Sequence, residues 1–134
     1  MPIRSLNEVL NDGDTNVFIS PIAELFGKLF QSRDVAHIIH LSTKSFEVHT
    51  ATNAYYDNVV GLLDSLIESY QGMYGLISIK IPSSNLVDAL SYFQDTLGYV
   101  QGARKLFKDG NLQSGLDDII DLLASTIYKL RFLQ

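Results

Sequence analysis

The spacing of apolar residues is the feature that most constrains the fold of this chain, because it follows the helical period over four separate stretches. The first stretch follows Ser20 and Pro21, a pair that favours a helix start because Ser accepts from an early amide and Pro fits the first helical position. Its apolar positions are Ile22, Leu25, Phe26, Leu29 and Ala36. No Gly or Pro occurs between residues 28 and 60, so we expect this helix to turn at the cap-type residues 42–45, with 50–53 as the second choice.

Three more helices are predicted downstream. The second runs from about Ser45 to Gln71 and is ended by Gly72 and Gly75. Its inward-facing residues are expected to be Tyr56, Leu63, Leu66, Ile67 and Tyr70. The third is capped by Ser83, Ser84 or Asn85 and ends near residues 108–111. Its inward-facing residues are expected to be Leu86, Leu90, Phe93, Leu97 and Val100. The fourth covers residues 112–132 and turns inward Leu116, Ile119, Ile120, Leu123, Ile127 and Leu130.

The connections between these helices predict their topology. The first and last pairs are joined by few residues, which makes each pair an antiparallel hairpin. Residues 72–84 lie between the pairs, and Ile77, Ile79 and Ile81 alternate there with polar residues in an extended pattern that has one apolar side. At roughly 3.3 Å per residue this segment spans about 43 Å, comparable to the second helix. We therefore expect an all-α, ferritin-like four-helix bundle with one long crossover between helices two and three. Residues 1–134 then form a single helical domain, with an N-terminal extension (1–19) and the bundle (20–134).

Composition narrows the classes of function. The 134 residues include no cysteine, which excludes disulfides and thiolate metal sites and leaves His, Asp, Glu and Tyr as metal ligands. The net charge of −5 disfavours contact with a nucleic-acid backbone. No apolar run reaches the 18 residues of a membrane span, and residues 1–14 do not form an apolar leader, so we expect a cytoplasmic protein without a membrane segment.

The residues that could carry chemistry are concentrated in residues 36–72. All three histidines, His37, His40 and His49, lie within thirteen residues of one another. On a helix that contains His49, the step of about 100° per residue places Asn53 and three acids within about 100° of it. Those acids are Asp57, Asp64 and Glu68. One helix face is therefore expected to gather an imidazole and three carboxylates, a donor set that suits iron, manganese or zinc.

Residues 36–72 resemble the Dps mini-ferritins. His37 matches the first histidine of that family, His49 the second histidine twelve residues later, and Asp64 and Glu68 the Asp-x-x-x-Glu. Asn53 stands where the family has an acid, Ile38 stands where an aromatic usually follows the first histidine, and Asp57 is a substitute ligand one turn on. The resemblance implies an oligomer that binds iron or a similar divalent metal at His37, His49, Asp57, Asp64 and Glu68, across a subunit interface. It also implies a ferroxidase activity that oxidises and sequesters Fe(II).

A second hypothesis is a non-catalytic structural or interaction protein that keeps the bundle without a working metal site. Asn53 in place of an acid favours it. The segments HLSTKSFEVH, YYD and ESYQGMYG also resemble a family of small, mostly phage-encoded proteins of undefined function, which implies the host cytoplasm or the virion as the location.

Several of the same residues have structural interpretations. His40 lies at the centre of the apolar stripe, where a core position is expected, and Asp64 and Glu68 also fit a solvated face. Val35, Ile38 and Ile39 lie outside that stripe, which predicts a second buried face and a homo-oligomer. The acidic surface would suit a basic protein partner, and no motif of a hydrolase is found.

Overall fold

The computed structural model describes residues 20–85 and 88–134, and these form an all-α fold. Four α-helices follow one another, α2 (Pro21–Ser42), α3 (Phe46–Tyr74), α4 (Ala89–Ala103) and α5 (Gly110–Phe132), and the 3-10 turn η1 (Arg104–Leu106) directly continues α4. The described residues contain no β-strand. The predicted four-helix bundle is confirmed. None of the described helices is both long enough and apolar enough to span a membrane.

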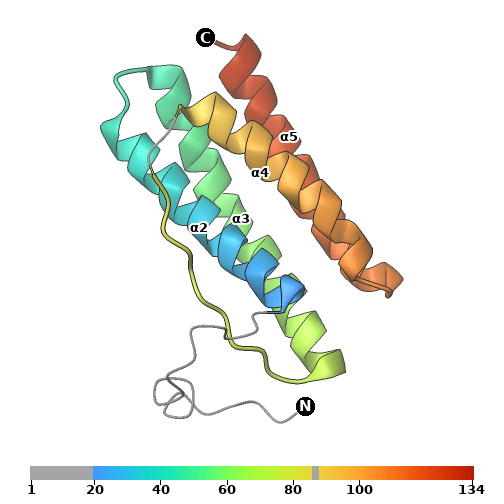
Figure 1. Ribbon diagram of the computed structural model, residues 1–134. Coiled ribbons are helices and arrows are strands. Elements are labelled where there is room, and N and C mark those ends of the chain that lie inside the picture. The colour runs from blue at the N-terminus through green and yellow to red at the C-terminus, as the bar shows by residue number, and fades with distance from the viewer. Residues whose placement is uncertain (1–19, 86–87) are drawn as a thin grey trace, which may run out of the picture.

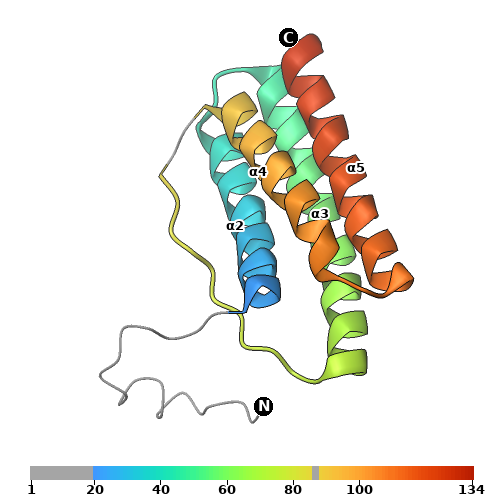
Figure 2. The ribbon, with the colours of Figure 1, turned by 45° about the vertical axis from the view of Figure 1, so that its right-hand side comes forward.

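Two helical hairpins, α2–α3 and α4–α5, make up the bundle (Figure 1). Helix α3 packs against both α2 and α5, whereas α4 packs against α5 and more sparsely against α2. The segment after α3 runs back along α2 from one end of the bundle to the other (Figures 1 and 2). This is the predicted long crossover, and it makes every pair of packed neighbours antiparallel.

Caps explain where the helices of the first hairpin begin and end. The Ser20 hydroxyl accepts a hydrogen bond from the Ala23 amide at 3.0 Å, and the Ser45 hydroxyl accepts one from Val48 at 3.2 Å. The turn therefore falls where the sequence predicts it. Helix α3 continues through Gly72 and ends only at Gly75, whose φ of +94° is the left-handed conformation that favours glycine. The predicted end at Gly75 is confirmed, and the helix extends three residues beyond the predicted Gln71.

Helix α4 begins later than the sequence predicts. Its cap is Asp88, whose carboxylate accepts a hydrogen bond from the Ser91 amide at 3.1 Å. The predicted caps Ser83, Ser84 and Asn85 belong to the crossover instead. Leu86, predicted to face inward, lies outside the described residues.

The crossover is held against α2 by a glycine and a buried glutamine. At Gly27 a Cβ atom would lie 2.0 Å from the Lys80 carbonyl oxygen, so only glycine leaves room for the crossover backbone. The Gln31 side chain, 5% exposed, donates to the carbonyls of Pro82 at 3.1 Å and Ser83 at 3.0 Å. Its own carbonyl oxygen accepts a hydrogen bond from the Tyr92 hydroxyl at 3.1 Å, which connects the crossover to α4 as well.

The core lies along the inner faces of the four helices. Its largest fully buried side chains include Tyr55, Phe26, Phe93, Leu63, Leu116 and Leu123. Tyr56, predicted to face inward, is half-buried and packs against this core, whereas its neighbour Tyr55, which was not among the predicted inward residues, is 0% exposed. Val35, predicted to belong to a second face, also packs in this core. Burial raises the pKa of the Tyr92 hydroxyl to about 12 and also raises that of Tyr55.

Candidate functional site

All three histidines gather at the turn between α2 and α3. His40 at the end of α2 and His49 at the start of α3 stack face to face, with ring centroids 3.6 Å apart and planes inclined by 19°. One turn back on α2, the His37 ring stacks on Tyr56 of α3 at 4.3 Å. The hairpin therefore brings together imidazoles that nine to twelve sequence positions separate.

Two reciprocal hydrogen bonds fix the central pair. Nδ1 of His40 donates to the His49 carbonyl at 2.7 Å, and Nδ1 of His49 donates to the His40 carbonyl at 2.8 Å. A carbonyl can only accept, so each Nδ1 carries the proton. His40 is half-exposed and satisfied by the backbone of the neighbouring helix, so the prediction of a core position for it was wrong. The pair fastens the α2–α3 turn.

Stacking limits what the His40–His49 pair can bind. Imidazole lone pairs lie in the ring plane, and those of two nearly parallel rings 3.6 Å apart do not converge on one ion. Asp57 is linked to this cluster only through Asn53, whose amide donates to the Asp57 carboxylate at 3.3 Å. The Tyr56 hydroxyl in turn donates to the Asn53 side-chain oxygen at 2.7 Å. Asn53, at the position where an acid was expected, therefore orders this polar chain.

The remaining predicted ligands lie farther along α3. Asp64 and Glu68 are exposed, about 10 and 16 Å beyond Asp57 along the axis at about 1.5 Å per residue. Within residues 20–85 and 88–134, no three His, Asp or Glu side chains are placed to hold one metal ion. The predicted ligands thus do not meet at a metal site within the described part of one chain, and a site shared between two chains stays a prediction.

The α2–α3 turn and the end of α5 lie at the same end of the bundle (Figures 1 and 2), and exposed apolar side chains belong to both segments. We name this set the end surface, and it comprises Ile38, Leu41, Phe46, Phe132 and Leu133. Leu41 is 72% exposed, Phe46 73% and Phe132 63%. Phe46 and Leu133 line a shallow cleft of about 400 Å³ together with Glu47, Thr50, Ala51 and Lys129. Of this set only Ile38 is distinguished by the sequence pattern, as an apolar residue outside the main stripe of α2.

The fold and this turn define a class of protein, a four-helix bundle whose first hairpin is fastened by a stacked histidine pair. In sequence, residues 40–130, more than half of the chain, match the family of unknown function DUF5856. The chain belongs to this family. The matched region includes His40 and His49, whereas His37 precedes it. No curated protein and no solved structure matches the chain.

Proposed function

We propose that this chain is a non-catalytic structural protein, the subunit of a homo-oligomer that associates through the end surface, in the cytoplasm or in a virion. The observation that supports the proposal is that five of the ten large exposed apolar side chains among the described residues belong to the end surface. Exposed apolar side chains that gather in one region mark protein contact sites, because removing them from water is favourable.

Two further features support a contact between copies. The His40–His49 hydrogen bonds hold the turn that carries Leu41 and Phe46 in one conformation, so little ordering entropy is lost when the surface is covered. The cleft beside Phe46 is lined by both an acid, Glu47, and a base, Lys129. A surface with both signs of charge can pair with itself about a two-fold axis.

The double variant Phe46→Ser/Leu133→Ser tests this proposal. We expect the native mass of the wild-type protein, measured by light scattering after size exclusion, to be a multiple of the 14.9 kDa subunit. Burial of one large apolar side chain contributes roughly 1.5–3 kcal/mol to association. The dissociation constant of the double variant should therefore be about tenfold higher or more than that of the wild type. Circular dichroism should show an unchanged helical content.

A matched control lies at the opposite end of the bundle. Tyr74, the last residue of α3, and Leu76 just after it are also exposed, at 56% and 73%. Helix α3 ends at the opposite end of the bundle from the α2–α3 turn (Figure 1). Tyr74→Ser/Leu76→Ser should therefore keep the wild-type mass. A wild-type protein that stays at the mass of one chain, or equal dissociation of both double variants, would contradict the proposal.

Iron binding across a subunit interface is the second candidate function. The exposure of His37, Asp64 and Glu68 favours it, because side chains on the surface are accessible to a neighbouring chain. Such a site needs the oligomer, since the described residues of one chain do not assemble it.

Anaerobic Fe(II) titration of the oligomer tests this candidate. We expect His49→Ala/Asp64→Ala to abolish the bound iron that elemental analysis detects in the wild type. Glu68→Gln should weaken it without touching the histidine turn, and Asp118→Ala on α5 serves as the control. Equal iron content in all four proteins would exclude the proposed ligands.

A further inference from the structure

The outer face of α4 carries four exposed residues in a symmetric spacing, Asp95, Gly98, Gly102 and Lys105. At about 100° per residue, these positions fall within about 80° of one another around the axis. Lys105 lies in η1, which directly continues the helix. The four residues therefore form one stripe, in which an acid and a base flank two glycines.

Neither glycine is explained by the fold of a single chain. Within the described residues only Gly75 has a positive φ, so Gly98 and Gly102 have ordinary helical backbones. A Cβ atom at either position would meet nothing within 4 Å. Glycine in a helix interior is less favourable than alanine, so this pair weakens α4 without a contact that requires it. At Gly27 the same absence of a side chain admits the crossover backbone, which shows what such a position can accept.

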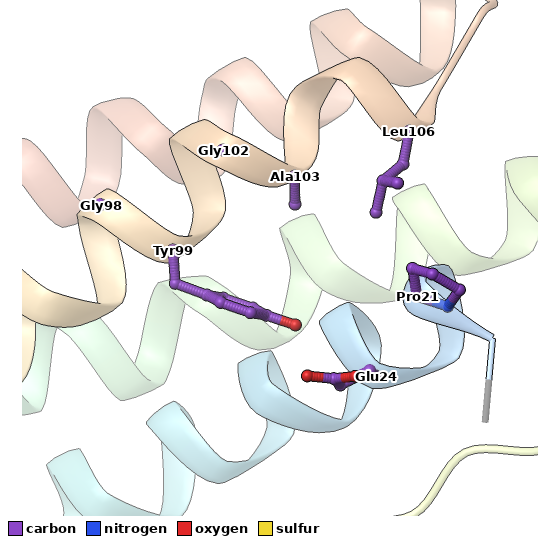
Figure 3. A pocket seen from close by; sticks show the side chains of 7 residues that line it. All are labelled: Pro21, Glu24, Gly98, Tyr99, Gly102, Ala103 and Leu106. Carbon is purple, nitrogen blue, oxygen red and sulfur yellow. The ribbon is translucent and has the colours of Figure 1, made fainter. Parts of the chain in front are cut away.

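A cleft of about 370 Å³ opens beside the glycines, along the sparsely packed seam between α2 and α4. Figure 3 shows its lining, Gly98, Tyr99, Gly102, Ala103 and Leu106 from α4 and Pro21 and Glu24 from α2. The Tyr99 side chain reaches across toward the Glu24 carboxylate. Partial burial and the nearby Glu24 raise the pKa of Tyr99. In Figure 2 no described segment lies in front of α4, and Gly98 and Gly102 are both exposed, which leaves room for an approaching backbone.

The stripe is complementary to itself. Asp95 and Lys105 lie five residues on either side of Val100, and Gly98 and Gly102 lie two residues on either side of it. A second α4 that crosses antiparallel at the level of Val100 would place each glycine opposite a glycine. It would also place each Asp95 opposite Lys105 of the partner subunit. An isologous contact requires this relation between opposing positions.

We propose that the outer face of α4 binds the same face of a second copy of this chain, in antiparallel orientation, with Asp95 paired to Lys105 of the partner subunit. Like the proposed function, this contact would form a homo-oligomer. It uses the outer face of α4 and not the end surface. Two isologous faces on one subunit extend an assembly beyond a dimer.

Charge reversal tests the pairing in the Phe46→Ser/Leu133→Ser background, where the end surface is disabled. Sedimentation equilibrium should show a dimer for this background. In a dimer of the Asp95→Lys variant, two lysines face each other at each end of the contact. In a dimer of the Lys105→Asp variant, two aspartates do. Each variant alone should therefore dimerise at least about tenfold more weakly. A 1:1 mixture of the two should restore a dimer, which native mass spectrometry should identify as mixed.

Two further variants separate the pairing from a change of fold. Asp118→Lys on α5 reverses an exposed charge elsewhere and should leave the dimer intact. Gly98→Ala/Gly102→Ala should raise the melting temperature of the monomer and weaken the dimer, because the methyl groups favour the helix but keep the second helix away. A background that stays monomeric at millimolar concentration would overturn the proposal, and so would a mixture that does not associate. If the α4 variants behave as expected while the Phe46→Ser/Leu133→Ser change has no effect on the wild-type assembly, only the end surface is refuted.

Discussion

Gly27→Ala is expected to destabilise the bundle, although alanine favours a helix more than glycine does. The added Cβ would lie 2.0 Å from the Lys80 carbonyl oxygen and 3.2 Å from its carbonyl carbon, so the crossover backbone must move away from α2. That movement also strains the hydrogen bonds from Gln31 to Pro82 and Ser83. Overpacking of this kind lowers the free energy of unfolding by about 1–3 kcal/mol, which urea titration followed by circular dichroism measures.

Gly61→Ala is the matched control for this prediction. Gly61 is exposed within α3, and a Cβ there would meet nothing within 4 Å. This change should raise the free energy of unfolding by about 0.5–1 kcal/mol. Hydrogen exchange should become faster in residues 77–83 of the Gly27 variant only. Two glycine variants that stabilise the protein equally would show that the crossover does not press on α2.

Local signals in the sequence were sufficient to predict the two hairpins and the crossover. Apolar residues at the helical period fix which face each helix buries, and the Ser20 and Ser45 caps act on amides only three residues away. The start of α4 could not be predicted in this way. Ser83 has a cap-type side chain, but the Gln31 amide binds its carbonyl from 52 positions away and holds it in the crossover. Contacts that distant leave no local pattern.

The candidate site, like the fold, could be predicted from the sequence only in part. A turn at residues 43–45 necessarily brings His40 and His49 near each other, so their proximity could be predicted from the sequence, although His40 was expected in the core. The stacked orientation depends on which carbonyl each Nδ1 reaches, and that is a property of the folded turn. The shared face of Asp57, Asp64 and Glu68 was argued from rotation about the helix axis. The rise along that axis separates Asp57 from Asp64 and Glu68, and therefore a common face does not make a common site within one chain.

Tyr55→Ala is expected to be the most destabilising single change in α3. Tyr55 is 0% exposed and packs edge-to-face against Phe93 with ring centroids 4.8 Å apart. Its hydroxyl shares a 2.7 Å hydrogen bond with Ser32, which also donates to the Leu29 carbonyl at 2.6 Å. Truncation of a large buried aromatic leaves a cavity and lowers the free energy of unfolding by about 3–5 kcal/mol. Urea titration should show this as a lower midpoint at an unchanged slope.

Two control variants test whether the loss of stability comes from the buried ring of Tyr55. Tyr55→Phe keeps the ring, and Ser32 keeps its bond to Leu29, so a loss of only about 1 kcal/mol is expected. Tyr56→Ala removes a half-buried ring that stacks on His37 near the surface, and it should cost clearly less than Tyr55→Ala. The rotation of α3 about its axis decides which of the two neighbouring tyrosines enters the core. Equal losses at positions 55 and 56 would therefore mean that α3 does not present Tyr55 to Phe93 in solution.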